Sequence, residues 1–598
     1  MLSARAFLGT WPWAVALFVV LVALGFSSDV ALIAALTSAC GLAVAAVGMD
    51  VMTGYAGQPL MGQGAFMAIG AYVSTAMMAN YGWSLLPALG MAILISAGVA
   101  VILGAGALRL AHIGLALVTF AFAFVVFTLA NGEIFKQWTG QSSGRVVPVG
   151  TLGPIDFYDP RSAYFGSLAA LLIVTALSYL YVHSRHGRIL MAIKRSELLP
   201  RVFGVNVLRA KMVAMVWSSI CGGLGGVIYA QTSGFVTPEA YVASLSILVL
   251  AIAAVGGLGT IVGPAAAAFL YGWLSYQGAS TSGSGLWWPV LFMAVLIFSP
   301  SGLFGIANGA WTFVKSRVRP IQRIADAKPV RSPDGDDRVR VTYKAVARSD
   351  RTALTVDGVT LRYGGVTALD EVSFIVREGE VHALIGPNGA GKTSMLDVLT
   401  GVTPVSSGHV HVFDVDATKL PAHRRVALGM TRSFQHAALV NDLTVLQNIE
   451  LVAENAAGRS RRASGRSPRA SAEDALRLLG IEPEVWKVEA EQLTGGLQKL
   501  VDIARAFASD ANLILLDEPT SGVTEHDVDK VSRAVASLRH AGRTVVVIDH
   551  NVEFVRGLAD SVTVLDFGRV IATGTPESVL RSPDVIKAFL GEERTIAN

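Results

Sequence analysis

Val381-His-Ala-Leu-Ile-Gly-Pro-Asn-Gly-Ala-Gly-Lys-Thr393 is a short apolar run that leads into a glycine-rich loop. The run predicts a buried strand, and the spacing from Gly386 to Thr393 is that of a phosphate-binding loop. Glycines let backbone N–H groups wrap phosphate oxygens, Lys392 reaches the outer phosphates, and a helix starting at Thr393 points its positive end at the same anion. The residues assigned to this loop are Gly386, Pro387, Asn388, Gly389, Ala390, Gly391, Lys392, Thr393 and Ser394.

Two further apolar runs end in residues that phosphate chemistry uses. The run 513–516 is followed by Asp517 and Glu518, and the run 544–548 leads to His550. Beside a phosphate loop, Asp517 suits a magnesium ligand together with Thr393, and Glu518 suits a base that polarises an attacking water. His550 is placed to contact the terminal phosphate. Strands that alternate with helices in this way predict an α/β domain.

The first 310 residues differ in composition from the rest. They hold 12 of the 48 Lys and Arg residues and 7 of the 44 Asp and Glu residues, whereas a soluble domain is about a quarter charged. Apolar runs long enough to cross a bilayer predict a polytopic all-α membrane domain, and no charge lies mid-span to serve as a proton relay. About eight full spans are expected, at 11–27, 30–50, 60–79, 85–107, 113–131, 163–182, 212–231 and 287–304.

One more apolar run, 243–275, is interrupted by Gly256-Gly-Leu-Gly259 and Gly263-Pro264. The segment 185–211 carries seven Lys and Arg residues against one acid, which predicts a cytoplasmic position. The nucleotide-binding domain that follows must be cytoplasmic too, so an even number of crossings must separate residue 211 from residue 305. With the spans 212–231 and 287–304, a single helix at 243–275 would give three crossings, whereas two short segments give four. This requirement favours two segments within 243–275, either a tight hairpin or a re-entrant pair.

These patterns divide the chain into a membrane domain at 1–310, a linker at 311–352 and an α/β domain at 353–598. The linker is rich in Arg, Asp and Pro and reads as a solvated connector. A second basic and Ser-rich stretch, 458–471, lies inside the α/β domain and is interpreted as a disordered surface loop. The positive charge of the first domain sets membrane orientation, so we expect contact with lipid and no nucleic-acid partner.

The α/β domain resembles the ATPase domain of ABC transporters over roughly 353–598. The resemblance follows the order of Tyr363, the phosphate loop, Gln435 in Arg-Ser-Phe-Gln, Leu493-Thr-Gly-Gly-Leu-Gln498, Asp517-Glu518 and His550. It implies ATP and Mg²⁺ as ligands, with Tyr363 stacked on adenine and Gln435 at the magnesium. It also implies that Thr494, Gly495 and Gly496 contact the γ-phosphate held by an opposing ATPase. His550 would be the switch histidine.

A narrower resemblance is to the branched-chain amino-acid importers. The ATPase motifs that carry it are the phosphate loop with its strand, Gly429-Met-Thr-Arg-Ser-Phe-Gln435 and the tail 583–592. The first domain is similar to the permease of these systems in Gly54-Tyr-Ala-Gly57, 64–72, Gly204-Val-Asn-Val and 256–264. The resemblance implies a natural fusion of permease and ATPase in the bacterial inner membrane. Its expected partners are a second permease, a second ATPase and an extracytoplasmic solute-binding protein.

Some residues depart from the family pattern, and other functions stay open. Leu497 replaces an amide of the signature, and Thr524 stands where many ABC ATPases have Asp. The segment around Glu197 and Gly204 resembles the importer loop that docks on the ATPase. The alternatives are a fused exporter, which would have six longer helices, and a membrane-anchored ATPase without transport. Relatives also carry urea, short amides and aromatic acids, and no residue here selects among these solutes.

Overall fold

The computed structural model of this chain divides into two compact units. One comprises Met1–Lys194 and Val207–Ile321, and the other comprises Arg195–Asn206 and Gln322–Asn598. The structure describes residues 17–110, 112–153, 155–241, 243–280, 294, 302–303, 351–433, 439–441, 443–460 and 467–590. Gln435, nearly all of the predicted span 287–304 and the linker up to residue 350 therefore lie outside the described residues, and the predicted domain limits stay predictions.

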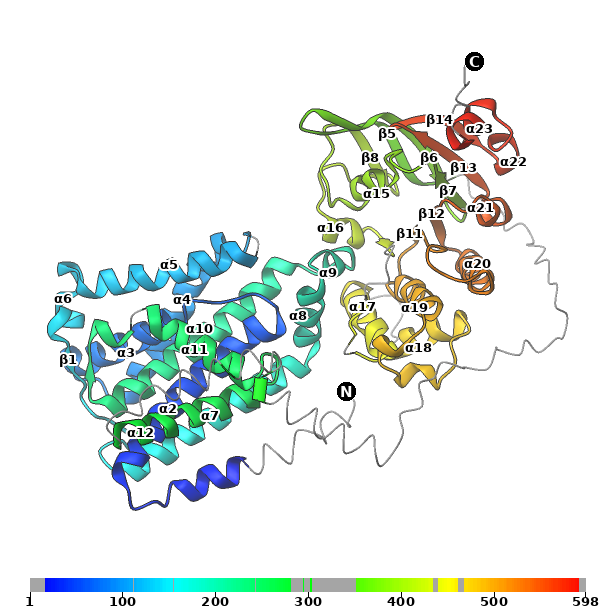
Figure 1. The fold of residues 1–598 in the computed structure, drawn as a ribbon. Coiled ribbons are helices and arrows are strands. Elements are labelled where there is room, and N and C mark those ends of the chain that lie inside the picture. The colour runs from blue at the N-terminus through cyan, green and yellow to red at the C-terminus, as the bar shows by residue number, and fades with distance from the viewer. Residues whose placement is uncertain are drawn as a thin grey trace, which may run out of the picture. The chain divides into compact units, whose positions relative to one another are not determined.

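The first unit is built of long apolar helices, as predicted (Figure 1). Its helices are α2 (Val30–Asp50), the π-helix η1 (Val51–Tyr55), α3 (Gln63–Tyr81), α4 (Leu85–Ala107), α5 (His112–Asn131), α6 (Lys136–Thr139), α7 (Pro160–His183), α8 (Arg185–Arg195), α10 (Val207–Ser233), α11 (Ala243–Gly256) and α12 (Val262–Ser280). Short two-stranded ladders join β1 (Arg145–Val146) to β4 (Phe235–Val236) and β2 (Thr151–Leu152) to β3 (Ile155–Asp156).

Six helices among the described residues are long and apolar enough to cross a membrane. They are Val30–Tyr55, Leu85–Ala107, Ile113–Asn131, Pro160–His183, Val207–Ser233 and Pro238–Gly256. The predicted span 60–79 is helix α3, which is not among these six, and the described residues 17–24 of the span 11–27 are helical. The run 243–275 is broken into α11 and α12, as predicted, by a loop over 257–261. The number of spans stays a prediction.

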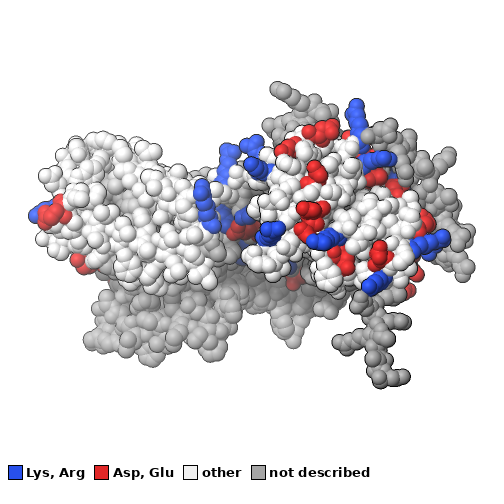
Figure 2. Space-filling model, turned by 90° about the horizontal axis from the view of Figure 1, so that it is seen from above, with Lys and Arg blue, Asp and Glu red and all other residues white. Residues whose placement is uncertain are grey.

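Close helix packing accounts for many glycines of the first unit. A Cβ atom on Gly41 of α2 would lie 2.8 Å from the carbonyl oxygen of Gly225 in α10, and one on Gly70 of α3 would collide with Gly223. Small residues let helix backbones approach in this way where lipid provides no hydrophobic drive for association. On the face seen in Figure 2, few charged side chains lie on this unit, whereas the second unit displays many of both signs.

The second unit is built around a six-stranded sheet of order β10-β11-β12-β7-β13-β14. Its strands are β7 (Val381–Ile385), β10 (Met430–Arg432), β11 (Leu513–Asp517), β12 (Thr544–Ile548), β13 (Ser561–Asp566) and β14 (Arg569–Gly574). All neighbouring pairs are parallel except β13–β14. A separate antiparallel sheet of order β6-β5-β8-β9 contains β5 (Thr352–Tyr363), β6 (Val366–Arg377), β8 (Ser407–Val412) and β9 (Val415–Asp416).

The central strands are buried on both faces, which explains their unbroken apolar runs. Every residue of β7, β11 and β12 is buried. Because side chains alternate along a strand, Ile514 and Leu516 enter the core beneath the helices. Leu513 and Leu515 enter the core shared with the antiparallel sheet. The central strands are therefore fixed in position, and their carboxyl ends form one edge.

The second unit also contains helices that connect its strands. They are α9 (Leu198–Val202), α15 (Lys392–Thr400), α16 (Ala422–Ala427), α17 (Val445–Ser460), α18 (Pro468–Leu478), α19 (Gly495–Ala508), α20 (Glu525–His540), α21 (Val552–Leu558), α22 (Pro576–Val579) and α23 (Pro583–Leu590). Helices α17, α18 and α19 pack on one another as a small helical group (Figure 1). The α/β prediction for this half of the chain is confirmed.

Candidate nucleotide site

The loop between β7 and α15 has the backbone shape of an anion cradle. Gly386, Gly389 and Gly391 all have positive φ angles, of 155°, 84° and 98°, which side chains of L-residues rarely adopt. A Cβ atom on Gly386 would collide with the carbonyl oxygen of Leu565, whereas one on Gly389 would meet nothing within 4 Å. The loop is thus tightly packed around Gly386 and open around Gly389.

Lys392 lies across this loop. Its Nζ donates hydrogen bonds of 2.7 Å to the carbonyl oxygens of Gly386 and Pro387. Burial lowers the pKa of Lys392, and the nearby charge of Glu518 opposes that shift. The ammonium group therefore sits inside the cradle rather than in bulk solvent, and it supplies positive charge next to the N-terminus of α15.

Asp517 and Glu518 end strand β11 at the same edge of the sheet. Asp517 pairs in register with Ile548 of β12, and Ile548 in turn neighbours Leu384 of β7, so three strands end together. Asp517 is buried, and burial raises its pKa. Glu518 is half-buried and has a φ of 42°, held by a 2.7 Å hydrogen bond from its N–H to the Ile548 carbonyl. A positive φ is a strained backbone angle for a residue other than glycine, and such angles occur at functional sites.

Arg432 is a site residue that the motif assignment did not include. It is the last residue of β10, its side chain is 5% exposed, and its Nη2 donates to Asp517 Oδ2 at 2.8 Å. Its Nη1 donates to Asp397 Oδ1 of α15 at 2.6 Å. One guanidinium thus joins the helix that follows the phosphate loop to the carboxylate at the end of β11. The arginine in Arg-Ser-Phe-Gln was the available signal, but its partners were not visible in the sequence.

Asp549 is a second residue that sequence reasoning missed. It is fully buried and accepts hydrogen bonds from the hydroxyl and N–H of Thr520 and from the N–H groups of His550 and Asn551. These contacts tie the chain after Glu518 to the chain after β12. His550 itself is 57% exposed, with its Nδ1 3.7 Å from Asp549. The His550 ring is therefore exposed beside the carboxyl end of β12.

The predicted signature residues lie at the start of helix α19. Thr494 is the N-cap residue, and a Cβ atom on Gly495 would come no closer than 3.8 Å to its nearest neighbour, so this position is open. A Cβ atom on Gly496 would collide with the carboxylate of Asp527. Leu497 packs against the apolar core of the helical group, which explains why an apolar residue is accepted there.

Thr524 has a local structural role. Its hydroxyl caps α20 by accepting a 3.3 Å hydrogen bond from the N–H of Asp527, and it also bonds the Asp527 carboxylate at 3.0 Å. Serine and threonine are preferred at this helix position because the side-chain oxygen satisfies an otherwise unpaired N–H group. A threonine therefore satisfies the helix start at a position where many ABC ATPases have aspartate.

Tyr363, Glu197 and Gly204 lie on other elements of the second unit. Tyr363 ends β5 and is half exposed. Glu197 forms a 2.8 Å ion pair with Arg201 on helix α9, and Gly204 follows that helix with a φ of 82°. Within the same unit, the guanidinium of Arg505 on α19 lies 4.7 Å from the ring centre of buried Phe203. The segment that contains Gly204 therefore contacts the helix that begins with the signature.

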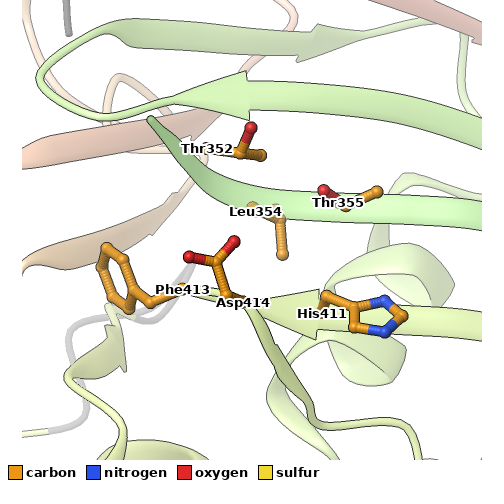
Figure 3. A pocket seen from close by; sticks show the side chains of 6 residues that line it. All are labelled: Thr352, Leu354, Thr355, His411, Phe413 and Asp414. Carbon is orange, nitrogen blue, oxygen red and sulfur yellow. The ribbon is translucent and has the colours of Figure 1, made fainter. Parts of the chain in front are cut away.

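A pocket of about 240 Å³ lies on the antiparallel sheet, at the turn that follows β8 (Figure 3). Its lining residues are Thr352, Leu354, Thr355, His411, Phe413 and Asp414. Phe413 and Asp414 both have left-handed backbone angles, of 47° and 64°, as a tight turn requires. None of the predicted nucleotide contacts is among these lining residues, so this pocket is separate from the candidate site.

Comparisons with known proteins agree with the predictions for both the membrane domain and the ATPase domain. Residues 31–300 match the family described as the permease component of the branched-chain amino acid transport system. Residues 369–521 match the ABC transporter family, and residues 569–595 match the branched-chain amino acid ATP-binding cassette transporter family. The permease match and the ATPase matches occur in one polypeptide.

Individual relatives point the same way. The chain is 34% identical over 251 residues to the high-affinity branched-chain amino acid transport ATP-binding protein LivG of Salmonella typhimurium, which covers 40% of this chain and 98% of LivG. It is 34% identical over 258 residues to BraF, the corresponding protein of Pseudomonas aeruginosa, with 40% and 99% covered. A nucleotide-free ATP-binding cassette is similar at 27% identity and a TM-score of 0.37, over 40% of this chain and all of that one. With a complete phosphate loop and a permease match at 31–300, the chain belongs to the branched-chain amino acid family of ABC transporters and joins their permease and ATP-binding parts in one polypeptide.

Proposed function

We propose that this protein uses ATP hydrolysis to import amino acids, with branched-chain amino acids as its main substrates, across the bacterial inner membrane. The observation that carries the proposal is the union of a permease part with an ATPase part whose phosphate loop is complete. Relatives of the ATPase part are named for high-affinity branched-chain amino acid transport. The complete phosphate loop of the ATPase part makes ATP the energy source of this proposal.

The chemistry is assigned to residues at the strand ends of the second unit. The phosphate loop binds the phosphates of ATP, and Lys392 neutralises their charge. Glu518 orients a water molecule and accepts its proton, while Asp549 holds the turn that presents His550. Thr393 and Asp517 are oxygen donors suited to Mg²⁺, which would neutralise charge between the phosphate groups. Tyr363 is assigned to the adenine ring, and Gln435 to contact with the metal site.

The working transporter is proposed to contain further subunits. A second permease would complete the membrane pathway, and a second ATPase would provide the surface opposite the phosphate loop. Thr494, Gly495 and Gly496 would contact the nucleotide held by that second ATPase. A solute-binding protein outside the membrane would deliver the amino acid.

The segment Arg195–Asn206 is proposed to transmit the ATPase movement to the membrane helices. It begins at the last residue of α8 but groups with the second unit. Its contact between Phe203 and Arg505 reaches the helix that carries the signature residues. Closure of two ATPases moves that helix, and the segment would move with it.

Uptake by the purified complex in proteoliposomes tests the proposal. The chain is reconstituted in vesicles with its partner permease, its partner ATPase and the solute-binding protein encoded beside it. ATP is supplied either inside or outside the vesicles. Radiolabelled leucine, isoleucine and valine should accumulate when ATP faces the ATPase domain and binding protein faces the opposite side. Glu518→Gln should abolish accumulation without loss of the complex.

Three outcomes would contradict parts of the proposal. Accumulation of urea, a short amide or an aromatic acid instead would contradict the proposed substrate class but not the proposed direction of transport. Movement of solute toward the side that lacks ATP would indicate an exporter. ATP hydrolysis that moves none of these solutes, in a complex that binds the solute-binding protein, would indicate an ATPase without transport.

A further inference from the structure

Asp50 is a fully buried carboxylate at the last residue of α2. Its Oδ1 accepts a 2.7 Å hydrogen bond from the N–H of Gly259, and its Oδ2 accepts one of 3.3 Å from the N–H of Ile261. Both donors belong to the loop that separates α11 from α12. Burying a carboxylate costs free energy unless hydrogen bonds compensate it, so these two hydrogen bonds explain how Asp50 is accommodated in the interior.

The loop that Asp50 holds has a strained backbone. Gly257 and Gly259 have φ angles of 111° and 87°, and Ile261 has a φ of 53°. A positive φ is unusual for a β-branched residue and costs on the order of 1–3 kcal/mol. The carboxylate of Asp50 accepts hydrogen bonds from the N–H groups of Gly259 and Ile261, on both sides of Thr260, and so stabilises this strained turn. Asp50 therefore sets the conformation between the two helices of the hairpin.

The same carboxylate lies against the turn that follows α2. The residues Val51–Tyr55 form a π-helix, a rare irregularity that often marks functional sites. A Cβ atom on Gly54 of this turn would collide with both the Asp50 carboxylate and the N–H of Gly259. Only glycine allows these three groups to meet. The two glycine motifs of the membrane part, 54–57 and 256–264, thus converge on one acidic side chain.

Lys194 joins this junction to the cytoplasmic segment. Its Nζ donates a 2.7 Å hydrogen bond to the carbonyl oxygen of Gly54. A Cβ atom on Gly57 would lie 2.9 Å from Lys194 Cγ, so the lysine stem packs on this glycine. Lys194 is the last residue of the first unit before the segment Arg195–Asn206, which groups with the ATPase. The π-helix is therefore bonded to the residue that directly precedes this segment in the chain.

We propose that Asp50 is the positioning residue that couples the segment Arg195–Asn206 to the α11–α12 hairpin of the permease part. The proposal rests on the proposed function as an ATP-driven transporter. A shift of Lys194 moves the carbonyl of Gly54, and the π-turn transfers that shift to Asp50. The strained loop then moves with the carboxylate, because two of its N–H groups are bonded to it.

A coupling ratio separates this role from a merely structural one. Asp50→Asn keeps the size of the side chain but loses the charge and one acceptor, and it is tested in the full complex in proteoliposomes. The amount of amino acid transported per ATP hydrolysed should fall about 10-fold while ATP hydrolysis continues. A factor of this size is typical of the coupling between two sites in a protein. Equal losses of transport and hydrolysis would show a structural role and overturn the proposal.

Two further variants keep the test decisive. Asp29→Asn removes a carboxylate at the other end of the same helix, where it caps α2 and accepts from Tyr276, and it should leave the ratio unchanged. Lys194→Met retains the stem that packs on Gly57 but removes the donor to Gly54. It should lower the ratio even if Asp50→Asn fails to insert, and an unchanged ratio in Lys194→Met would contradict the proposed route.

A readout without any solute distinguishes failure of this inference from failure of the transport proposal. Leu258 is 40% exposed in the loop, and the native Cys40 and Cys221 are buried. A Leu258→Cys reporter should react with a maleimide at a rate that changes when ATP and vanadate close the ATPases. Adding Asp50→Asn should remove the change. An unresponsive reporter in the parent, or an equal response in the double variant, would overturn the coupling role whichever solute is carried.

Discussion

Arg432 holds Asp517 through a 2.8 Å bond from Nη2 to Oδ2, although the two residues are 85 positions apart in the chain. The guanidinium is buried and holds the carboxylate of Asp397 with its other amino group. The helix after the phosphate loop and the acid at the end of β11 therefore share one cation. This arrangement fixes where the Asp517 carboxylate points and offsets part of the cost of burying it.

Replacing Arg432 with Gln should impair both folding stability and ATP hydrolysis. Removing one partner of a buried ion pair leaves an uncompensated charge and costs about 3 kcal/mol. Arg432→Lys should also fail, because an ammonium group lacks the two-pronged donor geometry of a guanidinium. Thermal unfolding and ATPase rate of the complex are the measurements. Arg569→Gln, which breaks an exposed pair with Asp370, is the control and should cost less than about 1 kcal/mol.

Hydrolysis should depend on Glu518. Glu518→Gln keeps the size of the side chain but cannot accept a proton, so ATP should still bind and trap a closed state. Turnover should slow by roughly 10²- to 10⁴-fold, the usual contribution of a general base. Single-turnover hydrolysis and retention of labelled ATP measure the two steps. Turnover at the wild-type rate in the assembled complex would remove Glu518 from the mechanism.

A bulky residue at Gly204 should uncouple ATP hydrolysis from transport while the protein still inserts. The φ of 82° already disfavours any side chain there, and Gly204 directly follows Phe203, which contacts Arg505. Uptake and hydrolysis are measured on the same vesicles. Gly234→Trp is the matched control, since Gly234 has a similar φ of 67° and directly follows α10, where a Cβ atom would meet nothing within 4 Å. Wild-type transport in Gly204→Trp would place the docking surface elsewhere.

The stability of the ATPase part should fall below pH 6.5 because of His382. Burial in strand β7 lowers the pKa of His382 to about 4, and its ring stacks on Phe374 at 5.4 Å. Between pH 6.5 and about 4 the unfolded chain gains a proton that the folded chain refuses, so unfolding is favoured by up to about 3 kcal/mol. Above pH 6.5 the histidine has no effect. Melting temperatures across this range should be less pH-dependent in His382→Gln than in the wild type.

The two faces of the ATPase should respond unequally to mutation. Lys392→Ala removes charge from a complete phosphate loop and should abolish transport. Gly495→Ala should reduce transport less. The signature of this chain already departs from the family pattern at Leu497, and a partner ATPase with a standard signature would complete the nucleotide site that contains Lys392. Gly495 is the better variant for this comparison, since a Cβ atom on Gly496 would collide with Asp527. Binding-protein-stimulated uptake by a homodimer of this chain alone would refute the asymmetric assembly.

The sequence alone was sufficient for the phosphate loop, the strand-end acids and the break in 243–275, because each is a local pattern. Glycines at Gly386 and Gly391 are needed for backbone angles, and an apolar strand that ends in Asp517 exposes its carboxylate at a sheet edge. These signals lie within a few residues of the feature they predict. The break at Gly256 is likewise local, since glycine and proline disfavour a continuous helix.

Only the tertiary structure determined which residues those patterns meet. Asp549 bonds Thr520 because β11 and β12 are neighbours in the sheet, and strand order is not a property of either strand. Asp50 meets Gly259 across 209 residues because two helix ends and a strained loop arrive at one point. The sequence marks a buried carboxylate only as a charge near a helix end. Its partners are backbone N–H groups, which every residue except proline carries, so no side-chain pattern could have identified them.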